Sequence, residues 1–307
     1  MTTLSSSKET APPFPGETPP SSPEVSPPVA VHVPERTIRV GYQGEAGAYS
    51  QRAVKRLFTQ ATSVPFHSVH RVFEAVEIGT VAFGVVPLEN SHAGSINESY
   101  DLLVRHGVSI VGETIVRISH CLLALPGTPL DEVRTVYSHT QALDQCSEFL
   151  DSLPVERIAV HDTAGAARIL AERKESGAAA IASTEAAQLY ELEVLASDIE
   201  DRADNSTKFV AIARGGSDLF GPPEKTSVVF ATADMPGALY RCLKEFADRH
   251  LNLSKLEHRP SRAKAWQSNF YVDFDAPVHD PAAQEALQAV AELTSFLRVL
   301  GSYPRAR

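Results

Sequence analysis

A short polar run directly before an apolar segment carries side chains that could do chemistry. The run Asn205–Lys208 holds an amide, two hydroxyls and an ammonium group, and Phe209 and the apolar residues 210–213 follow it. The apolar residues predict a strand buried in a sheet, along which side chains alternate between two faces. Asn205, Thr207 and Phe209 are therefore expected on one face, and the residues between them on the other. Taken alone, this run is explained more simply as an ordinary loop that enters a strand.

A second polar run follows the predicted strand Val81–Val86. It contains a carboxylate, two amides, hydroxyls and a glycine within Glu89–Asn97. Open α/β sheets bind ligands at the carboxyl ends of their strands, so this position favours a binding site. Capping of the next helix by Ser95 or Asn97 would explain those two residues alone, and not the whole run.

Three further polar turns open predicted helices. Near the start, the strand Thr37–Tyr42 leads through a glycine turn, Gln43–Ser50, into a helix at 53–58. Backbone N–H groups in such a turn can approach an anion closely, and the helix dipole adds partial positive charge. The other two turns lie at Ser138–Gln145 and at Thr163. The first turn lacks the glycine spacing of a dinucleotide-binding fingerprint, so we expect no nicotinamide cofactor.

The elements around these runs alternate between strand and helix. Strands at 64–66 and 81–86 flank a helix at 72–78, and a second set of strands lies at 133–137, 158–160 and 178–181. Such alternation predicts parallel sheets of the α/β class. Because the polar runs follow the strands, the positions that could bind a substrate should gather in one cleft.

Taken together, the runs closely resemble those of the prephenate dehydratase family, whose members make phenylpyruvate on the route to phenylalanine. The family motif Asn-x-Thr-Arg-Phe corresponds to Asn205, Thr207 and Phe209, with Lys208 in place of the arginine. The resemblance also includes Pro-Leu-Glu-Asn-Ser at 87–91, Ser-His-x-Gln at 138–141, where a threonine replaces the family's proline, and Thr-Ala-Gly-Ala-Ala at 163–167.

The resemblance implies a reaction and a set of site residues. Prephenate loses carbon dioxide and its ring hydroxyl together, and aromatisation drives the reaction. Thr207 would donate a hydrogen bond to the departing hydroxyl, and no cofactor or metal is required. The catalytic residues implied are Thr207, Asn90, Gln145 and Ser138. Those implied for substrate binding are Gly47, Tyr49, Ser50, Glu89, Ser91, Gln141, Thr163, Asn205, Lys208 and Phe209.

The C-terminal part predicts strands and helices in the order βαββαβ between Thr226 and Ser302, which is ferredoxin-like. It resembles the ACT domain, a regulatory module that binds amino acids, and the resemblance implies feedback by phenylalanine in a homodimer or homotetramer. The absence of a side chain at Gly237 would expose backbone N–H groups to a ligand carboxylate, and Glu257 could help to hold its ammonium. The effector site implied comprises Gly237, Ala238, Leu239, Leu256, Glu257, Arg259 and Pro260.

Three segments are therefore expected along the chain. Residues 1–36, rich in proline, serine and threonine, should form a disordered tail because they cannot bury enough surface to fold. The resemblance implies a catalytic domain of two lobes, arranged as in periplasmic binding proteins, before the ACT domain. The expected limits are 37–214 for the catalytic domain, with lobe one at 37–114 and 204–214 and lobe two at 115–203, and 225–307 for the ACT domain.

Composition limits the partners and the compartment. The formal net charge of −10 over 307 residues disfavours binding to nucleic acid, which requires a basic surface. The three cysteines are far apart and lack a Cys-x-x-Cys pair, so neither a disulfide framework nor a zinc site is indicated. No apolar stretch approaches the length of a membrane span, and the first residues lack the features of a signal peptide. A small-molecule substrate and a cytoplasmic location are expected, with no membrane partner.

Two other interpretations stay open. Arogenate dehydratase removes the same groups from a substrate with an amino instead of a keto side arm, and the sequence does not separate the two activities. A noncatalytic amino-acid sensor, built from a two-lobed receptor and an ACT module, is the alternative from another class. The lack of a signal peptide disfavours an extracytoplasmic receptor. The presence of Asn205 and Thr207 disfavours an inactive relative of the enzyme.

Overall fold

The computed structural model describes residues 37–217, 219–260 and 268–306, so the tail expected at 1–36 lies outside the described residues. The strands are β1 (Ile38–Gln43), β2 (Ala61–Phe66), β3 (Phe83–Asn90), β4 (Gly94–Ser95), β5 (Ser109–Arg117), β6 (Cys121–Ala124), β7 (Thr135–His139), β8 (Glu156–Val160), β9 (Ala178–Ala182), β10 (Glu193–Ala196), β11 (Ser206–Ala213), β12 (Lys225–Thr232), β13 (Leu253–Pro260), β14 (Ser268–Phe274) and β15 (Thr294–Tyr303). The helices are α1 (Tyr49–Leu57), α2 (Val69–Glu77), α3 (Asn97–Arg105), α4 (Thr140–Gln145), α5 (Ser147–Asp151), α6 (Thr163–Arg173), α7 (Thr184–Leu189), α8 (Ala238–Ala247) and α9 (Pro281–Leu293), with a 3₁₀ turn η1 (Leu130–Glu132).

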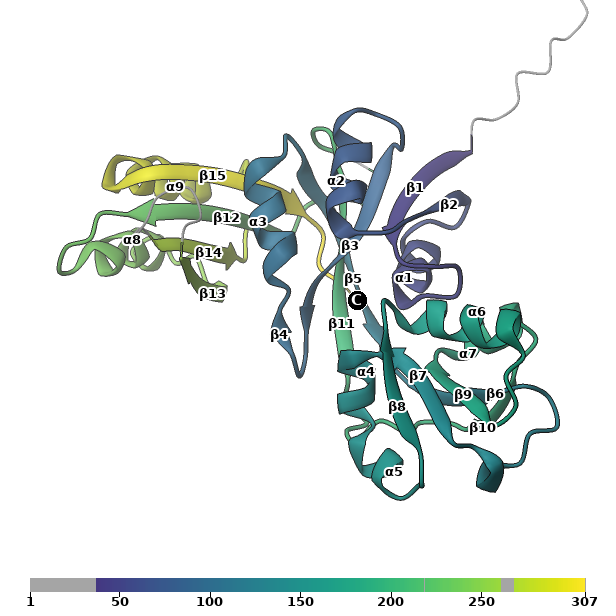
Figure 1. Ribbon diagram of the computed structural model, residues 1–307. Coiled ribbons are helices and arrows are strands. Elements are labelled where there is room, and N and C mark those ends of the chain that lie inside the picture. Colours follow the sequence, from purple (N-terminus) through teal and green to yellow (C-terminus); the bar gives the residue numbers. More distant parts are fainter. Residues whose placement is uncertain (1–36, 218, 261–267, 307) are drawn as a thin grey trace, which may run out of the picture. The chain divides into compact units, whose positions relative to one another are not determined.

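Two β-sheets organise the described residues (Figure 1). The larger has ten strands in the order β13-β14-β12-β15-β5-β11-β3-β1-β2, with β4 paired to β3. The smaller has five strands in the order β10-β6-β9-β7-β8. The α/β class predicted from the alternation of elements is confirmed, but both sheets are mixed and not parallel throughout. The run Glu89–Asn97 begins at the end of β3, whereas Asn205–Lys208 leads into β11.

Lobe one contains the part of the larger sheet from β5 to β2. β1 pairs parallel with β2 and β3, whereas β11 returns from far along the chain and runs antiparallel between β3 and β5. In α2, the apolar residues Val69, Val72, Phe73 and Val76 recur at helical spacing and are buried against the sheet. This packing fixes β3 and β11 side by side, with their polar ends adjacent.

Lobe two is built on the smaller sheet. β7 runs parallel to β8 and β9, and β6 is antiparallel to β9 and β10. All five residues of β9, Ala178–Ala182, are buried, and α6 packs Ala166, Ala167 and Leu170 against one face of this strand. Because most of these side chains are small, the helix lies close to the strand, and its first turn comes to the carboxyl end of the sheet.

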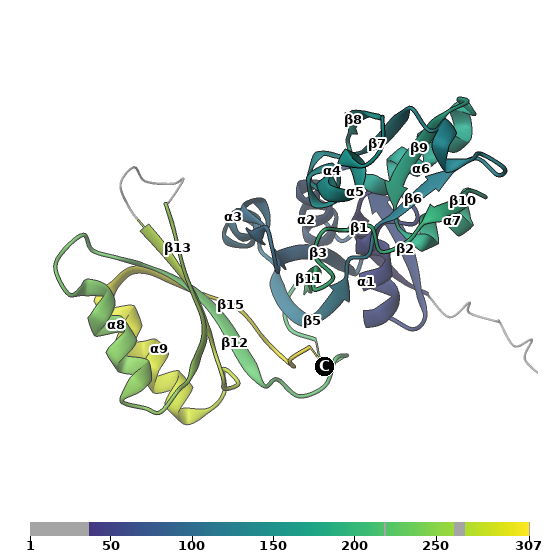
Figure 2. The same ribbon diagram turned by 90° about the horizontal axis from the view of Figure 1, so that it is seen from below.

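The C-terminal unit has the predicted βαββαβ order, β12-α8-β13-β14-α9-β15. Its strands lie in the order fourth, first, third, second, which is ferredoxin-like, and α8 and α9 cover one face of them (Figure 2). One residue pair, Gly301 with Ile110, links β15 to β5. A Cβ atom on Gly301 would lie 2.1 Å from the Ile110 carbonyl oxygen, so this approach requires glycine. The domain limits expected from the sequence stay a prediction.

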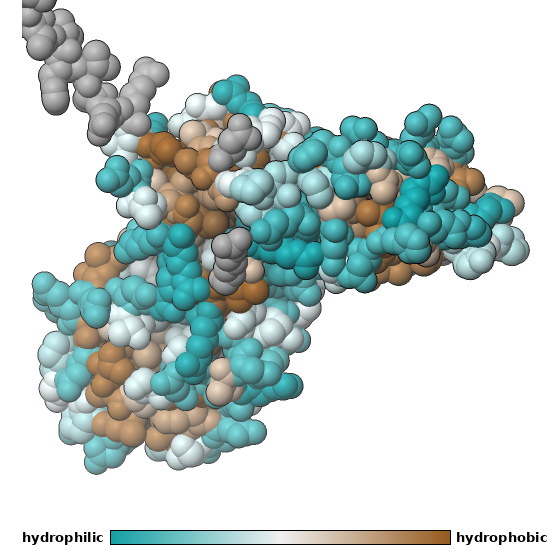
Figure 3. Space-filling model, turned by 180° about the vertical axis from the view of Figure 1, so that it is seen from behind, coloured by the Kyte–Doolittle hydropathy of each residue, from teal (hydrophilic) through white to brown (hydrophobic). Residues whose placement is uncertain are grey.

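None of the helices in the described part of the chain is both long enough and apolar enough to span a membrane. Figure 3 shows hydrophilic residues over much of the face opposite to that of Figure 1, with hydrophobic residues in separate patches. Exposed hydrophobic side chains of the C-terminal unit include Met235, Tyr240, Leu256 and Phe296.

Candidate active site

A cavity of about 260 Å³ lies where the carboxyl ends of strands from both lobes meet. Its lining combines the turn after β1, the end of β3, the start of β11 and the residues that follow β5, β7 and β8. It is lined by Gln43, Gly44, Ala48, Tyr49, Ser50, Pro87, Asn90, Ala93, Gly94, Ser95, Ile96, Ile118, His120, His139, Gln141, Ala142, Gln145, His161, Asp162, Thr163, Thr207 and Phe209. The cavity therefore lies where the strand order predicts a ligand site.

Eight residues expected at the site line this cavity. They come from both lobes, as the sequence motifs imply. They are Tyr49, Ser50, Asn90, Gln141, Gln145, Thr163, Thr207 and Phe209.

Asn90 holds the Thr207 hydroxyl from one side. Its amide nitrogen donates to Thr207 Oγ1 at 3.0 Å and to Asn205 Oδ1 at 2.8 Å, and its oxygen accepts from the backbone amides of His92 and Ala93. All of the polar atoms of the Asn90 side chain are thus engaged, which fixes its orientation. Among the described residues, the Thr207 hydroxyl accepts this bond and has no acceptor of its own. Its hydrogen is therefore available to a ligand in the cavity.

Gln145 connects the two lobes behind Thr207. Its side-chain oxygen accepts from Asn205 Nδ2 and faces His120 Nε2, each at 3.1 Å. Because an amide oxygen can only accept, this arrangement places a proton on His120 Nε2. Burial lowers the pKa of His120, so the ring is neutral near pH 7. The Gln145 amide group then keeps its hydrogens for a ligand.

His120 was not among the residues expected at the site, although it lines the cavity and is buried. The signal available in the sequence was an imidazole directly before the apolar residues Cys121–Leu123. Its ring also packs edge-on against Tyr49, whose hydroxyl donates to the Ser119 carbonyl at 2.5 Å. The Tyr49 ring thus lines the cavity, but its hydroxyl hydrogen is already bonded to the Ser119 carbonyl and is not free for a ligand.

Backbone N–H groups at a helix start could attract an anion into the cavity. No lysine or arginine occurs among the residues of known position that line it. The first turn of α1 lies at the wall, carries no acidic residue and has no side-chain cap at Ala48. The first turn of α6 also lies there, with the Asp162 side chain accepting from the Gly165 amide. The N-terminus of α1, with the hydroxyls of Ser50 and Thr163, can hold a carboxylate, whereas the N-terminus of α6 is already capped by the Asp162 carboxylate.

Ser138, expected to be catalytic, does not line the cavity. It is fully buried, and its hydroxyl donates to the Ile181 carbonyl at 2.7 Å, which ties β7 to β9. Gly47 also lies outside the cavity lining. It has a φ of +90°, and an added Cβ would lie 2.9 Å from Ala186 Cα, so its role is close packing of lobe one on lobe two.

Two more residues expected to bind substrate are used inside the protein. The Ser91 hydroxyl donates to the Asp204 carbonyl and accepts from the Ser206 amide, at 3.1 and 2.9 Å. Asn205 is buried behind the cavity, where it bridges Asn90 and Gln145. Both residues shape the site without lining it.

Glu89 and Lys208 lie on the opposite face of the strands from the cavity. β3 and β11 pair Glu89 with Lys208 and Asn90 with Thr207, so alternation sends the two pairs to different faces. The Lys208 ammonium lies 3.7 Å from a Glu89 carboxylate oxygen. The alternation predicted from the sequence thus holds, and it removes both residues from the cavity lining to which the family motif had assigned them.

The residues implied for an effector site are spread over the C-terminal unit. Gly237, Ala238 and Leu239 open α8, and Gly237 has a φ of +76° with open space around it. Leu256 and Pro260 are exposed on β13. Glu257 and Arg259 instead contact lobe one: the Ser95 hydroxyl donates to Glu257, and Arg259 reaches Asn97 at 2.5 Å and Asp101 at 3.2 Å.

Comparison with known proteins gives the family. Residues 40–217 match the family model described as prephenate dehydratase. Arogenate dehydratase/prephenate dehydratase 2, chloroplastic, of Arabidopsis thaliana is 44% identical over 281 residues, which cover 87% of this chain and 73% of that protein.

Solved structures agree with this result. Prephenate dehydratase from Arthrobacter aurescens, in complex with L-Phe, is 30% identical with a TM-score of 0.80 and covers 88% of this chain and 90% of its own. GqqA, described as a novel type of quorum quenching acylase, is also 30% identical, with a TM-score of 0.79 over 87% of this chain and 98% of its own. The resemblance found in the sequence motifs is confirmed: this chain belongs to the prephenate dehydratase family.

Proposed function

We propose that this chain is a prephenate dehydratase that converts prephenate to phenylpyruvate in L-phenylalanine biosynthesis. The observation that carries the proposal is the Thr207 hydroxyl at the cavity wall, held as an acceptor by Asn90 and left with a free hydrogen. The fold and the family model support the same activity.

In the proposed reaction, the bond between the ring and its carboxylate breaks and carbon dioxide leaves. The electron pair passes through the ring, the ring carbon–oxygen bond breaks, and the oxygen departs as hydroxide. The ring becomes aromatic, so no oxidant or cofactor is required. Thr207 donates a hydrogen bond to the departing oxygen as its charge develops, which is electrostatic stabilisation of the transition state.

The remaining lining positions the substrate. Phe209 contacts the ring, and the amide groups of Gln141 and Gln145 donate to its polar substituents. The N-terminus of α1 holds one carboxylate, with Ser50 as an additional donor, and the Thr163 hydroxyl donates to the other.

A direct assay tests this function. Purified protein is incubated with prephenate at neutral pH, and phenylpyruvate is followed by its absorbance in alkali. Turnover that saturates with prephenate is expected. A folded protein that turns over neither prephenate nor arogenate would refute the proposed lyase activity. GqqA, which is described as a quorum quenching acylase, shares the fold, so an acylase substrate is included as a control and should not be hydrolysed.

Arogenate dehydratase is the second candidate, and one observation favours it. Asp162 is the only carboxylate among the described residues that line the cavity, where no lysine or arginine accompanies it. One of its oxygens accepts from Gly165, which leaves the other for the ammonium of an amino side arm. If arogenate is the substrate, Asp162→Asn lowers kcat/KM for arogenate by about tenfold, as expected for a lost charged hydrogen bond, and changes that for prephenate far less. Equal losses for both substrates would contradict this role.

The proposal extends to regulation by phenylalanine through the C-terminal unit, in a homodimer or homotetramer, and to a cytoplasmic location. The Arthrobacter aurescens relative was solved with L-Phe, and here Gly237 leaves an open, uncapped start to α8. Calorimetric titration of the full chain with phenylalanine, tyrosine and tryptophan, beside activity assays, tests the effector. Coupling of about 1–3 kcal/mol would change substrate affinity about 5- to 150-fold. If none of the three amino acids binds or changes the activity, the proposed regulation is refuted.

A further inference from the structure

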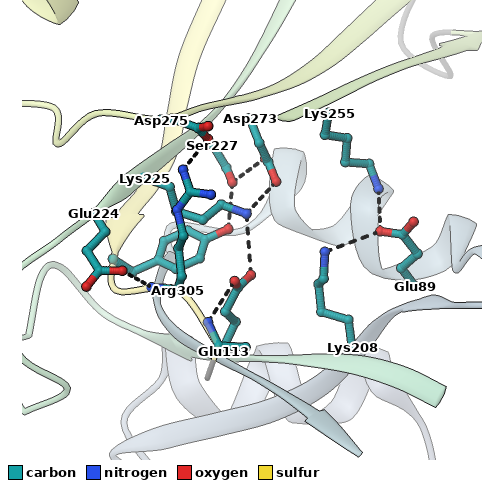
Figure 4. Close-up of polar contacts among 12 residues, drawn as sticks. Glu89, Glu113, Lys208, Glu224, Lys225, Ser227, Lys255, Asp273, Asp275 and Arg305 are labelled. Atoms are coloured by element: carbon teal, nitrogen blue, oxygen red, sulfur yellow. Dashed lines mark hydrogen bonds and ion pairs between the residues drawn. The ribbon is translucent and has the colours of Figure 1, made fainter. Parts of the chain in front are cut away.

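A polar cluster lies behind the cavity, where β13 of the C-terminal unit meets β3, β11 and α3 of lobe one. The Lys255 ammonium lies 3.0 Å from a Glu89 carboxylate oxygen, which in turn lies 3.7 Å from the Lys208 ammonium (Figure 4). Lys255 also contacts Glu257 at 3.3 Å and donates to the Tyr100 hydroxyl. The Lys255 side chain is 14% exposed, whereas that of its partner Glu89 is 37% exposed, so the cluster is partly buried.

Glu89 and Lys208 of this cluster are the chain neighbours of the site residues Asn90 and Thr207. Glu89 precedes Asn90 on β3, and Lys208 follows Thr207 on β11. Because side chains alternate, an ion pair on the back of the two strands fixes the same backbone that presents Asn90 and Thr207 on the front.

The strands need this support because their pairing is irregular here. The register between β11 and β3 shifts between Lys208 and Phe209, so β3 carries one extra residue at this point. Such a bulge disrupts the ladder of backbone hydrogen bonds locally. The Glu89–Lys208 pair lies directly beside the shift, and Lys255 holds Glu89 from the far side.

A second arm of the cluster reaches the cavity by another route. The Ser95 hydroxyl donates to Glu257, and Ser95 lines the cavity on the turn after Asn90. The Lys255 ammonium contacts both Glu89, which belongs to β3, and Glu257, which binds Ser95 on the turn after β3.

The charges of the cluster balance only with Lys255 present. Two ammonium groups, on Lys208 and Lys255, face two carboxylates, on Glu89 and Glu257. Without Lys255, Glu257 loses its cation and Glu89 keeps only the longer contact with Lys208. Partly buried carboxylates that lose a partner reorient toward water or toward another donor, and here that movement would start one residue from Asn90.

We propose that Lys255 is a positioning residue for catalysis: by holding Glu89, it keeps the end of β3 in the place from which Asn90 bonds to the Thr207 hydroxyl at the cavity wall. This inference rests on the proposed lyase function. It makes the active site dependent on a side chain of the C-terminal unit that does not line the cavity.

Lys255→Met tests the inference because methionine keeps the length and flexibility of the side chain and removes the charge. Misplacement of a reacting group by about 1 Å can cost about 100-fold, so a fall in kcat of about 10- to 100-fold is expected, with KM within about twofold. Lys255→Arg keeps the charge and should recover most of the rate. The control is Lys244→Met, which removes another lysine ion pair of the same unit, the exposed pair between Lys244 on α8 and Asp248 just after it, and should leave kcat unchanged.

The outcomes separate the explanations. If Lys255→Met lowers thermal stability and leaves kcat unchanged, or raises KM alone, Lys255 does not position the reacting groups. Should that variant fail to fold, Glu89→Gln takes its place: it must lower kcat in the same way, and normal kcat would overturn the inference. When both variants fold, Glu89→Gln with Lys255→Met should be no worse than either alone. An inactive wild type would refute the lyase function itself, and with it this role; an active wild type with an unimpaired Lys255→Met would refute only the role.

Discussion

Replacing Thr207 with valine removes one hydroxyl from the cavity wall and keeps the branched shape of the side chain. The loss leaves no buried donor without a partner. Asn90 Nδ2, which donates to Thr207 in the wild type, keeps Asn205 Oδ1 at 2.8 Å and the Ser206 carbonyl at 3.2 Å. The free energy of unfolding should therefore fall by only about 1 kcal/mol, the typical net contribution of one hydrogen bond.

The effect on the reaction should be much larger. The Thr207 hydrogen has no acceptor within the described protein, so its contribution appears when charge develops on the departing oxygen. Loss of one such donor costs about 2.7–4 kcal/mol, or about 10²- to 10³-fold in kcat. KM should change little, because the interaction is made mainly in the transition state. The difference between a small change in stability and a large change in rate is the signature of this role.

The assay compares Thr207→Val and Thr207→Ser by steady-state kinetics on whichever substrate the wild type turns over, with thermal unfolding of each protein. Serine keeps the hydroxyl and should retain kcat within about tenfold, since only its orientation is less restricted. A valine variant with near-normal kcat would remove Thr207 from the mechanism. A serine variant as impaired as the valine variant, with normal stability, would show that the methyl group matters rather than the hydroxyl.

Three further substitutions test other parts of the structure. Lys225→Met leaves the carboxylates of Glu113 and Asp273 buried without their shared ammonium (Figure 4), so urea unfolding should show a loss of about 3–5 kcal/mol; a loss below about 1 kcal/mol would contradict the burial of this cluster. Lys208→Arg should keep kcat/KM within about twofold of the wild type or improve it, because the longer guanidinium still reaches Glu89 on the back of β3. A tenfold drop would contradict this expectation. Burial lowers the pKa of His120, so as pH falls the unfolded chain takes up a proton on this ring at a higher pH than the folded protein does, and the free energy of unfolding decreases below about pH 6.5. His120→Gln should reduce this decrease, measured by urea unfolding between pH 7 and pH 5. An unchanged decrease would contradict the assignment to His120.

Strand alternation was the most reliable guide to the site. It predicts that Thr207 and Phe209 share a face, and both line the cavity. Asn205 belongs to the same face but lies just before β11, where its side chain bridges Asn90 and Gln145. Those partners are 115 and 60 residues away in the chain, and local periodicity holds no information about such distant pairing.

The position of a hydroxyl beside a helix start was not predictable from residue type. Ser138 and Ser50 both lie where a strand or turn leads into a helix, yet Ser50 lines the cavity and Ser138 bonds to the Ile181 carbonyl. The difference depends on β9 lying next to β7, which is a property of the sheet order. His120 was missed for a related reason: its apolar neighbours Cys121–Leu123 indicate core, and only the folded lobes bring it to Gln145.

In the polar runs of β3 and β11, alternate side chains point toward the cavity and away from it, and only those that point toward it can contact a substrate. Lys208 lies within the family motif but on the back of β11, so the lysine in place of the family's arginine alters the ion pair with Glu89 rather than the lining of the cavity. β13 supplies Lys255 to that same ion pair, and Glu89 is joined to Asn90 by one peptide bond. If Lys255 has the role that we propose, a ligand that moves β13 needs no path through the cavity to change the rate. It would act by withdrawing the Lys255 ammonium from Glu89, which loosens the end of β3 that presents Asn90 to Thr207.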